Sequence, residues 1–234
     1  MATAEVFRTA EPPDEDRTVP GETLDLDGVE LLLRELGSDG RLVHLERFPA
    51  RPARHRDLER PLPAAVAAAI GVDRFWTHQA QAIAHALAGR HTVTTTPTAS
   101  GKTLCYNAPV LSTMLQDPAS RALYLYPTKA LAQDQLAELQ ALCEQLETST
   151  GASLGVFTYD GDTPADARRT IRNSAHIVLS NPDMLHAGIL PFHNRWKKLF
   201  ENLRFVIIDE LRFINRTRYS RIRKRRKEYF TIEI

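Results

Sequence analysis

Apolar runs alternate with segments of helical periodicity from Thr77 to Asp209. Runs such as ALYLY (122–126) and FVII (205–208) are uninterrupted, which is typical of strands buried on both faces. Between these runs apolar positions recur every three or four residues, as in helices that cover a sheet. The pattern predicts strands over 91–96, 121–127, 153–159, 175–180 and 203–209, and helices over 78–88, 101–115, 129–147 and 164–174. Thr77 is the expected N-cap of the first of these helices.

Strands that alternate with helices form βαβ units, so we expect an α/β fold with one parallel sheet and helices on both faces. Ligands of such sheets bind beyond the carboxyl ends of the strands. Candidate site residues should therefore follow Thr96, Pro127, Tyr159, Ser180 and Asp209.

The chain divides into four segments by composition. Residues 1–23 are polar and contain proline, and we expect them to be disordered. Residues 24–74 read as a small accessory α/β segment, with helices over 29–36 and 64–70 and a strand over 41–48. Residues 75–211 form the main domain, and 212–234 form an atypical basic tail.

The composition of the chain excludes several classes of protein. With 43% hydrophobic and 25% charged residues, the chain is neither collagen-like nor wholly disordered. Cys105 and Cys143 lie in helical patterns without a CxxC partner, which argues against a disulfide framework and favours the cytoplasm. The acidic N-terminus is not a secretory signal, no apolar run is long enough to span a membrane, and the scattered histidines predict no zinc site.

Charge is distributed unevenly along the chain. Residues 212–234 carry a net charge of +7, and residues 1–211 carry a net charge of −6. A genuine basic helix could bind DNA by counterion release. We favour instead a shifted reading frame, a junction or a foreign end, because the change in composition falls inside a motif.

The segment TPTASGKT (96–103) follows a predicted strand and opens a predicted helix, the context of a phosphate-binding loop. Gly101 allows the backbone to approach phosphates, Lys102 reaches the β- and γ-phosphates, and the Thr103 hydroxyl ligates Mg²⁺. Thr96 stands where the usual pattern has its first glycine. The alternative is a Ser/Thr-rich turn with an exposed lysine. The predicted loop residues that bind the nucleotide are Thr98, Ala99, Ser100, Gly101, Lys102 and Thr103.

Two carboxylates, Asp209 and Glu210, follow the strand FVII. Asp209 can hold Mg²⁺ through water, and Glu210 can orient and deprotonate the attacking water, as in the Walker B arrangement of nucleotide hydrolases. Many strands end in Asp-Glu, so this signal depends on Lys102. We expect adjacent strands of one sheet to bring the turn around Lys102 and the acidic pair together. We predict Lys102, Asp209 and Glu210 as catalytic residues.

The segment FWTHQAQAI (75–83) precedes the phosphate loop. The Gln79 amide has both a donor and an acceptor, which suits the edge of adenine. Phe75 or Trp76 can pack beside the base. The alternative is an ordinary glutamine on an amphipathic helix.

Together with YPTKALAQDQ (126–135), YDGDTP (159–164), SNPDML (180–185) and VIIDEL (206–211), these segments resemble the first RecA-like lobe of superfamily 2 DExH (DEAD/DEAH box) helicases. They are most similar to the Hrq/MrfA branch of RecQ4-like DNA repair helicases. The resemblance covers about residues 41–211. It implies a P-loop ATPase that prefers ATP with Mg²⁺ and binds nucleic acid, DNA rather than RNA.

The resemblance also implies a nucleic-acid-binding rim. The matching residues offer backbone amides, hydroxyls and one lysine to phosphates, which favours binding without sequence reading. The alternative for 127–129 and 181–183 is that these residues only form turns, because Pro, Asn and Asp are common turn residues. The predicted nucleic-acid-binding residues are Pro127, Thr128, Lys129, Gly161, Asp162, Asn181, Pro182 and Asp183.

The chain departs from the family pattern after DEL, where Arg212 and Phe213 replace a histidine and an aromatic-containing helix. We see no Ser-Ala-Thr motif, second lobe or cysteine-rich domain, so we expect a helicase truncated after motif II that unwinds little by itself. The alternatives are a binding module without turnover and another P-loop enzyme such as a small-molecule kinase. The kinase lacks support, because the loops at 126–135 and 180–185 are not kinase features.

Overall fold

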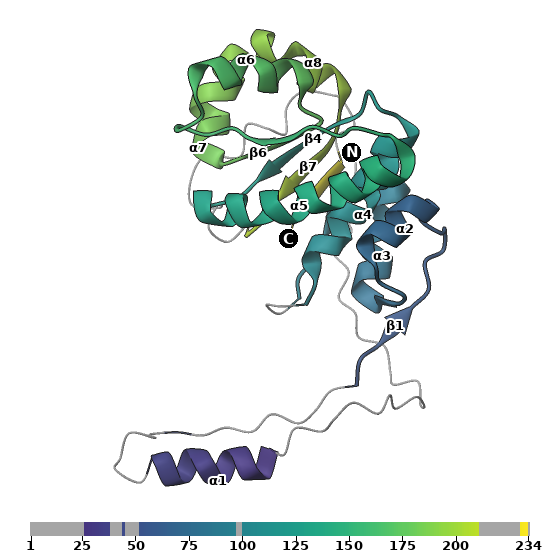
Figure 1. Cartoon of the computed structure of the whole chain (residues 1–234), viewed down its shortest axis with the longest axis vertical. Coiled ribbons are helices and arrows are strands. Elements are labelled where there is room, and N and C mark those ends of the chain that lie inside the picture. Colours follow the sequence, from purple (N-terminus) through teal and green to yellow (C-terminus); the bar gives the residue numbers. More distant parts are fainter. Residues whose placement is uncertain (1–25, 38–43, 45–51, 97–99, 211–229, 234) are drawn as a thin grey trace. The chain divides into compact units, whose positions relative to one another are not determined.

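The structure is a computed structural model that describes residues 26–37, 44, 52–96, 100–210 and 230–233 (Figure 1). The chain folds as two compact units, with a boundary between Arg54 and His55. The smaller unit, Arg8–Arg54, contains helix α1 (Leu26–Leu36), whose Leu31 and Leu32 are exposed. The predicted strand over 41–48 and the predicted disorder of 1–23 lie outside the described residues.

The larger unit carries the remaining elements. They are β1 (His55–Arg56), α2 (Ala64–Ile70), β2 (Phe75–Trp76), α3 (Thr77–Leu87), β3 (Thr92–Val93), α4 (Lys102–Gln116), β4 (Arg121–Leu125), α5 (Lys129–Thr150), β5 (Val156–Thr158), α6 (Ala165–Ser174), β6 (Ile177–Ser180), α7 (Pro182–Met184), η1 (Leu185–Ile189), η2 (Leu190–Trp196), α8 (Lys197–Asn202), β7 (Leu203–Ile208) and β8 (Phe230–Glu233).

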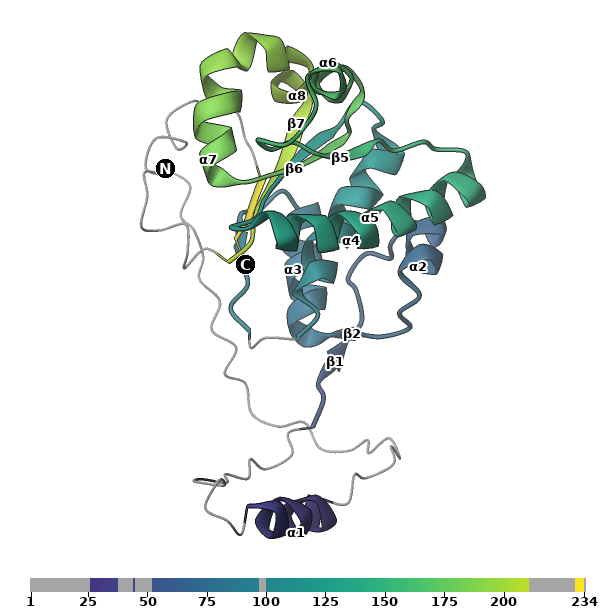
Figure 2. The ribbon, with the colours of Figure 1, turned by 60° about the vertical axis from the view of Figure 1, so that its left-hand side comes forward.

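Six of these strands form one parallel sheet in the order β3-β8-β7-β4-β6-β5. Each residue of β4 is buried, and successive side chains face opposite sides of the sheet. Tyr124 packs with α4 and α5 on one side, whereas Leu123 and Leu125 pack with α6 and α8 on the other. Figures 1 and 2 show the same two helical layers. This arrangement confirms the predicted fold class.

Strand β8, which the sequence pattern did not predict, lies inside the sheet between β3 and β7. Its backbone pairs in parallel with β7, where Phe205 is opposite Phe230, and with β3, where Val93 is opposite Glu233. Residues 230–233 thus join the strand before the phosphate loop to the strand that ends at Ile208. The rest of the tail, including Arg212 and Phe213, lies outside the described residues.

Helices α2, α4 and α5 begin within one residue of the predicted positions. Thr77 is the first residue of α3 rather than its cap, because Trp76 has the extended conformation of the N-cap. The irregular helical segment over 182–202 was not predicted. In the part of the chain that the structure describes, no helix is both long and apolar enough to cross a membrane.

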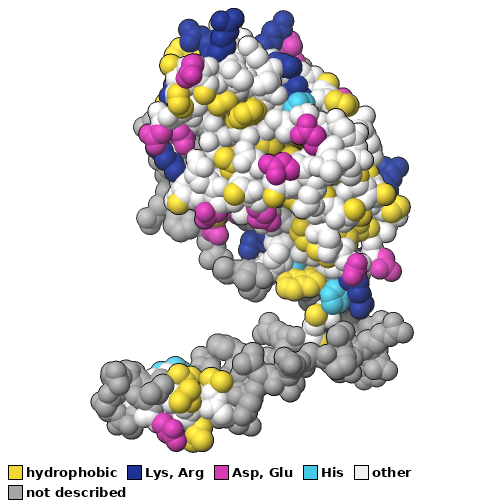
Figure 3. Space-filling view, in the orientation of Figure 1, with side chains coloured by type: hydrophobic (Ala, Val, Ile, Leu, Met, Phe, Trp, Pro, Cys, Tyr) yellow, Lys and Arg dark blue, Asp and Glu magenta, His cyan; other side chains and the backbone are white. Residues whose placement is uncertain are grey.

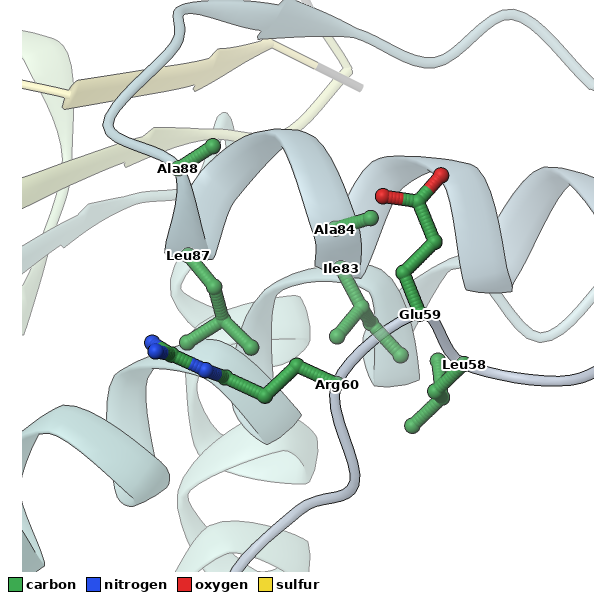
Figure 4. A pocket seen from close by; sticks show the side chains of 7 residues that line it. All are labelled: Leu58, Glu59, Arg60, Ile83, Ala84, Leu87 and Ala88. Atoms are coloured by element: carbon green, nitrogen blue, oxygen red, sulfur yellow. The ribbon is translucent and has the colours of Figure 1, made fainter.

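A small cavity of about 160 Å³ lies between α3 and the segment 58–60 (Figure 4). Ile83, Leu87 and Leu58 give it an apolar lining, and the charged ends of Glu59 and Arg60 point in different directions. None of its lining residues is among the predicted site residues.

Candidate functional site

The phosphate-loop segment connects β3 to the first residue of α4, Lys102. Gly101 is the N-cap of α4 and has a left-handed backbone with φ 67°, a conformation that glycine adopts without strain. The buried Ser100 shares a hydrogen bond between its hydroxyl and that of Thr96. Thr98 and Ala99 lie outside the described residues. The start of α4 therefore presents a helix N-terminus, which attracts anions, directly after a glycine.

Two neighbouring side chains at the start of α3 hold this loop. Gln79 accepts a hydrogen bond from the Trp76 amide at 3.0 Å and donates one from Nε2 to the Gly101 carbonyl at 2.9 Å. These bonds use one amide hydrogen and one lone pair of Gln79, and the side chain is only 5% exposed, so its observed role is to hold the loop.

His78 holds the preceding carbonyl and was missed by sequence reasoning. Its Nε2 lies 2.9 Å from the Ser100 carbonyl oxygen. Burial lowers the pKa of His78, and the charge on Lys102 lowers it further, so the ring is neutral at pH 7 and donates from Nε2. The only sequence signal was its position next to Gln79.

Of the two aromatic candidates beside the base, the structure favours Trp76. Phe75 belongs to the core and is 9% exposed, whereas Trp76 is 40% exposed and contacts the ring of His78 edge-on. The side chain of Phe75 therefore packs in the core rather than facing solvent.

Lys102 and Asp209 lie within electrostatic reach of each other. The Lys102 ammonium donates to the Thr96 carbonyl oxygen at 3.2 Å. Burial raises the pKa of Asp209 and the charge on Glu210 raises it further, while Lys102 acts in the opposite direction. Thr103 is half-buried in the first turn of α4, one position after Lys102.

The second carboxylate, Glu210, is exposed and has an unusual backbone. Its φ of 53° is the only positive value among the described residues other than glycine. Its amide donates to Asp209 Oδ1 at 2.9 Å, so the turn holds the Asp209 carboxylate and leaves the Glu210 side chain in solvent.

The strands that bring these groups together are not adjacent. We expected the phosphate loop and the acidic pair on neighbouring strands, but β8 lies between β3 and β7. Because all three strands are parallel, the end of β7 still faces the same edge of the sheet as the loop after β3.

The remaining predicted residues line the continuation of this edge. Pro127, Thr128 and Lys129 follow β4, and the Thr128 hydroxyl caps α5 by accepting from the Leu131 amide at 3.3 Å. Asn181, Pro182 and Asp183 follow β6, and Asn181 Oδ1 caps α7 by accepting from the Met184 amide at 2.8 Å. Turn chemistry is thus present at both loops.

Gly161 and Asp162 follow β5 in a tight turn. The Asp160 carboxylate accepts from the amides of Asp162 and Thr163, which fixes the turn. Asp162 forms an ion pair with Lys129, so the loops after β5 and β4 meet across the end of β6, the strand between them. The pairing joins the loop after β4 to the loop after β5.

Positive charge does not gather at this edge. The predicted rim carries Lys129 but also Asp162 and Asp183. Figure 3 shows Lys and Arg over α6 and α8, and acidic side chains over α5. Phosphates would be held here by amides, hydroxyls and a single lysine.

No group of three metal-ligating side chains occurs among the described residues. That does not conflict with magnesium, which is commonly bound by one or two carboxylates together with substrate phosphates. The donors present, a hydroxyl at Thr103 and a half-buried carboxylate at Asp209, are the oxygen ligands that this ion prefers.

Comparisons with known proteins agree with this geometry. The model of the DEAD/DEAH box helicase family matches residues 76–228. The chain is 45% identical over 183 residues to the uncharacterized ATP-dependent helicase YprA of Bacillus subtilis, which covers 77% of this chain and 24% of YprA. It is 39% identical over 197 residues to the ATP-dependent helicase hrq1 of Schizosaccharomyces pombe, covering 80% of this chain and 18% of hrq1.

A solved structure is similar as well. The DUF1998 helicase MrfA, crystallised with DNA and AMPPNP, superposes with a TM-score of 0.72 and 42% identity, covering 85% of this chain and 30% of MrfA. The chain thus spans about a quarter of the length of YprA and less of hrq1.

Proposed function

Because the chain belongs to the DEAD/DEAH box helicase family, we propose that it forms the first ATP-binding lobe of an ATP-dependent DNA helicase of the repair type. The observation that carries this proposal is that the loop after β3, which leads to Lys102, and the end of β7, which leads to Asp209, lie at the same edge of one parallel sheet. The likeness to MrfA, which was crystallised with DNA and AMPPNP, supports ATP and DNA as the ligands.

In this proposal the triphosphate lies over the start of α4. Lys102 leaves the Thr96 carbonyl and reaches the β- and γ-phosphates, while the Ser100, Gly101 and Lys102 amides at the helix N-terminus donate to phosphate oxygens. Thr98 and Ala99 complete the loop. The Gln79 amide reads adenine with its second hydrogen and lone pair, and Trp76 packs beside the base.

Thr103 and Asp209 are the residues that would hold Mg²⁺, directly and through water. When bound, the ion neutralises charge that develops on the phosphates. Glu210 orients the attacking water and accepts its proton. Burial is the main reason that the pKa of Asp209 is raised, and a bound cation would compensate the buried carboxylate for the solvent it has lost.

The nucleic-acid backbone crosses the loops after β4, β6 and β5. Pro127, Thr128 and Lys129, then Asn181, Pro182 and Asp183, and then Gly161 and Asp162 supply the contacts. Contact to phosphates rather than base edges fits an enzyme that acts on many sequences. Strand separation further requires a second lobe that moves against this one. We also place the protein in the cytoplasm, which is supported by its two buried, free cysteines.

Binding without hydrolysis is the second candidate function. It is favoured by the exposure of Glu210 and by the bond between Lys102 and the Thr96 carbonyl, since neither side chain is held ready for the reaction. Release of phosphate from ATP, measured with and without single-stranded DNA, separates the two. DNA-stimulated turnover that Lys102→Ala abolishes supports the enzyme, whereas nucleotide binding without turnover supports the module.

A further inference from the structure

A buried tyrosine cluster lies between the two halves of the proposed site. Tyr106 comes from α4, and Tyr124 and Tyr126 come from β4 and the residue after it; all three are at most 1% exposed. The rings of Tyr106 and Tyr124 meet edge-on with centroids 5.4 Å apart. Buried hydroxyls need partners, so the bonds of this cluster restrict how α4 and β4 can move against each other.

The hydroxyls have a defined order. Tyr106 donates to Oε1 of Gln135, on α5, at 3.1 Å. The Tyr126 hydroxyl lies 3.4 Å from that of Tyr106, and because the Tyr106 hydrogen is already used, Tyr126 is the donor. Tyr124 instead donates to Oδ1 of Asn107 at 3.0 Å, and Asn107 is on α4.

One end of this chain of bonds reaches the nucleotide residues. Tyr106 lies three positions after Thr103 on α4, so the two side chains are neighbours on one face of the helix. The charge on Asp209 raises the pKa of both Tyr106 and Tyr126, although burial is the larger cause.

The other end reaches the nucleic-acid residues. Tyr126 immediately precedes Pro127, and Gln135 is on α5, which begins at Lys129. Tyr106 therefore contacts the residue before the loop 127–129 and a residue of α5, the helix that follows this loop. Apolar side chains of α4, β4 and α5 also pack against one another. The tyrosine hydroxyls add directional contacts between the start of α4 and the residues around the loop 127–129.

We propose that Tyr106 is a positioning residue whose hydroxyl, through Gln135 and Tyr126, couples nucleotide binding at the start of α4 to nucleic-acid binding at the loop 127–129. The inference rests on the proposed function. A displacement of Thr103 by magnesium and phosphate shifts Tyr106, which changes the position of α5 and the loop before it. We expect bound nucleotide to strengthen DNA binding in this way. By linkage, DNA must then strengthen nucleotide binding by the same factor.

The test is an equilibrium linkage measurement that needs no turnover. The affinity for magnesium-AMPPNP carrying a fluorescent group is measured with and without saturating oligo-dT. We expect DNA to tighten binding roughly 5-fold or more in the wild-type chain. In Tyr106→Phe the ratio should fall to within about 2-fold of unity, while the affinity for each ligand alone changes less than about 3-fold.

Tyr124→Phe is the matched control. It removes a buried hydroxyl from the same cluster but leaves the bonds to α5 intact, so the wild-type ratio should persist. Gln135→Met, at a half-buried surface position, should reproduce the loss and keeps the test possible if Tyr106→Phe fails to fold. The double variant should lose no more than either single one.

The results separate failure of this inference from failure of the proposed function. A wild-type ratio near unity, an unchanged ratio in Tyr106→Phe, or an equal loss in Tyr124→Phe overturns the coupling role. If the wild-type chain binds no AMPPNP at all, the proposed function fails and the coupling fails with it.

Discussion

The side chain of Gln79 donates from Nε2 to the Gly101 carbonyl oxygen at 2.9 Å, so the first turn of α3 holds the residue before α4. The approach is close enough that a side chain at position 101 would displace the end of the Gln79 side chain. A Cβ there would lie 2.6 Å from Gln79 Nε2. The glycine is therefore needed for its φ and for the space it leaves.

Gly101→Ala should destabilise the chain and weaken nucleotide binding. The left-handed backbone costs about 1–2 kcal/mol for alanine. Displacement of Gln79 adds the loss of a hydrogen bond, about 1 kcal/mol. Urea unfolding measures the sum.

Gly151→Ala is the control for this prediction, because Gly151 has a similar φ of 73° at the end of α5 and nothing within 4 Å of its Cβ position. It should incur only the backbone penalty and leave AMPPNP affinity unchanged. Equal losses in the two variants would show that the contact with Gln79 contributes nothing.

Asp162→Asn should strengthen binding of single-stranded DNA. Asp162 pairs with Lys129, the one basic residue of the predicted rim, so a phosphate must now compete with a carboxylate. Removing that charge should raise affinity several-fold at low salt, and the slope of log K against log salt should steepen by roughly 0.7, the value for one further contact to a single strand. Fluorescence anisotropy of labelled oligo-dT measures both.

Asp166→Asn changes the net charge equally but lies in the first turn of α6. It should have a smaller effect than Asp162→Asn. The same gain in both variants would mean that only the overall charge matters and that the ion pair does not restrain Lys129.

His176 should make stability depend on pH. Its Nδ1 accepts from the Gly155 amide at 3.0 Å, which requires the neutral ring, and burial lowers its pKa, helped by the charges of Arg121 and Lys198. Since the folded pKa lies below the unfolded one, the unfolded state binds more protons. This stabilisation is complete above about pH 6.5 and is lost as the pH falls below it.

The free energy of unfolding should therefore fall between pH 7.5 and pH 5.5, with a contribution of at most about 1.4 kcal/mol per pH unit from this group. His176→Asn can keep an acceptor near Gly155 without titrating, so its curve should be flatter. His186→Asn, at an exposed position, should follow the wild-type curve. Parallel curves for the wild type and His176→Asn would contradict this explanation.

Local signals were enough to predict much of the sheet and the starts of the main helices. Gly101 can adopt the left-handed backbone found just before α4. Thr128 supplies a side-chain oxygen that caps α5. The segment over 182–202 was missed because Pro182 and Pro191 interrupt its periodicity, and it folds as short α, π and 3₁₀ turns.

Features that depend on distant partners could not be predicted locally. Strand β8 is specified by pairing with β3 and β7, and its composition alone suggested a foreign end. Likewise the role of His78 depends on a carbonyl 22 positions away, and the ion pair of Lys129 on a carboxylate 33 positions away.

In the proposed function Lys102 and Asp209 bind one magnesium-bound triphosphate, and calorimetric titration with AMPPNP tests this most directly. We predict that Lys102→Ala weakens binding roughly tenfold or more with or without magnesium, because it removes a charge-assisted contact to phosphate. Asp209→Asn should weaken it only when magnesium is present. Wild-type affinity in Lys102→Ala, or an effect of Asp209→Asn that persists in EDTA, would contradict the account.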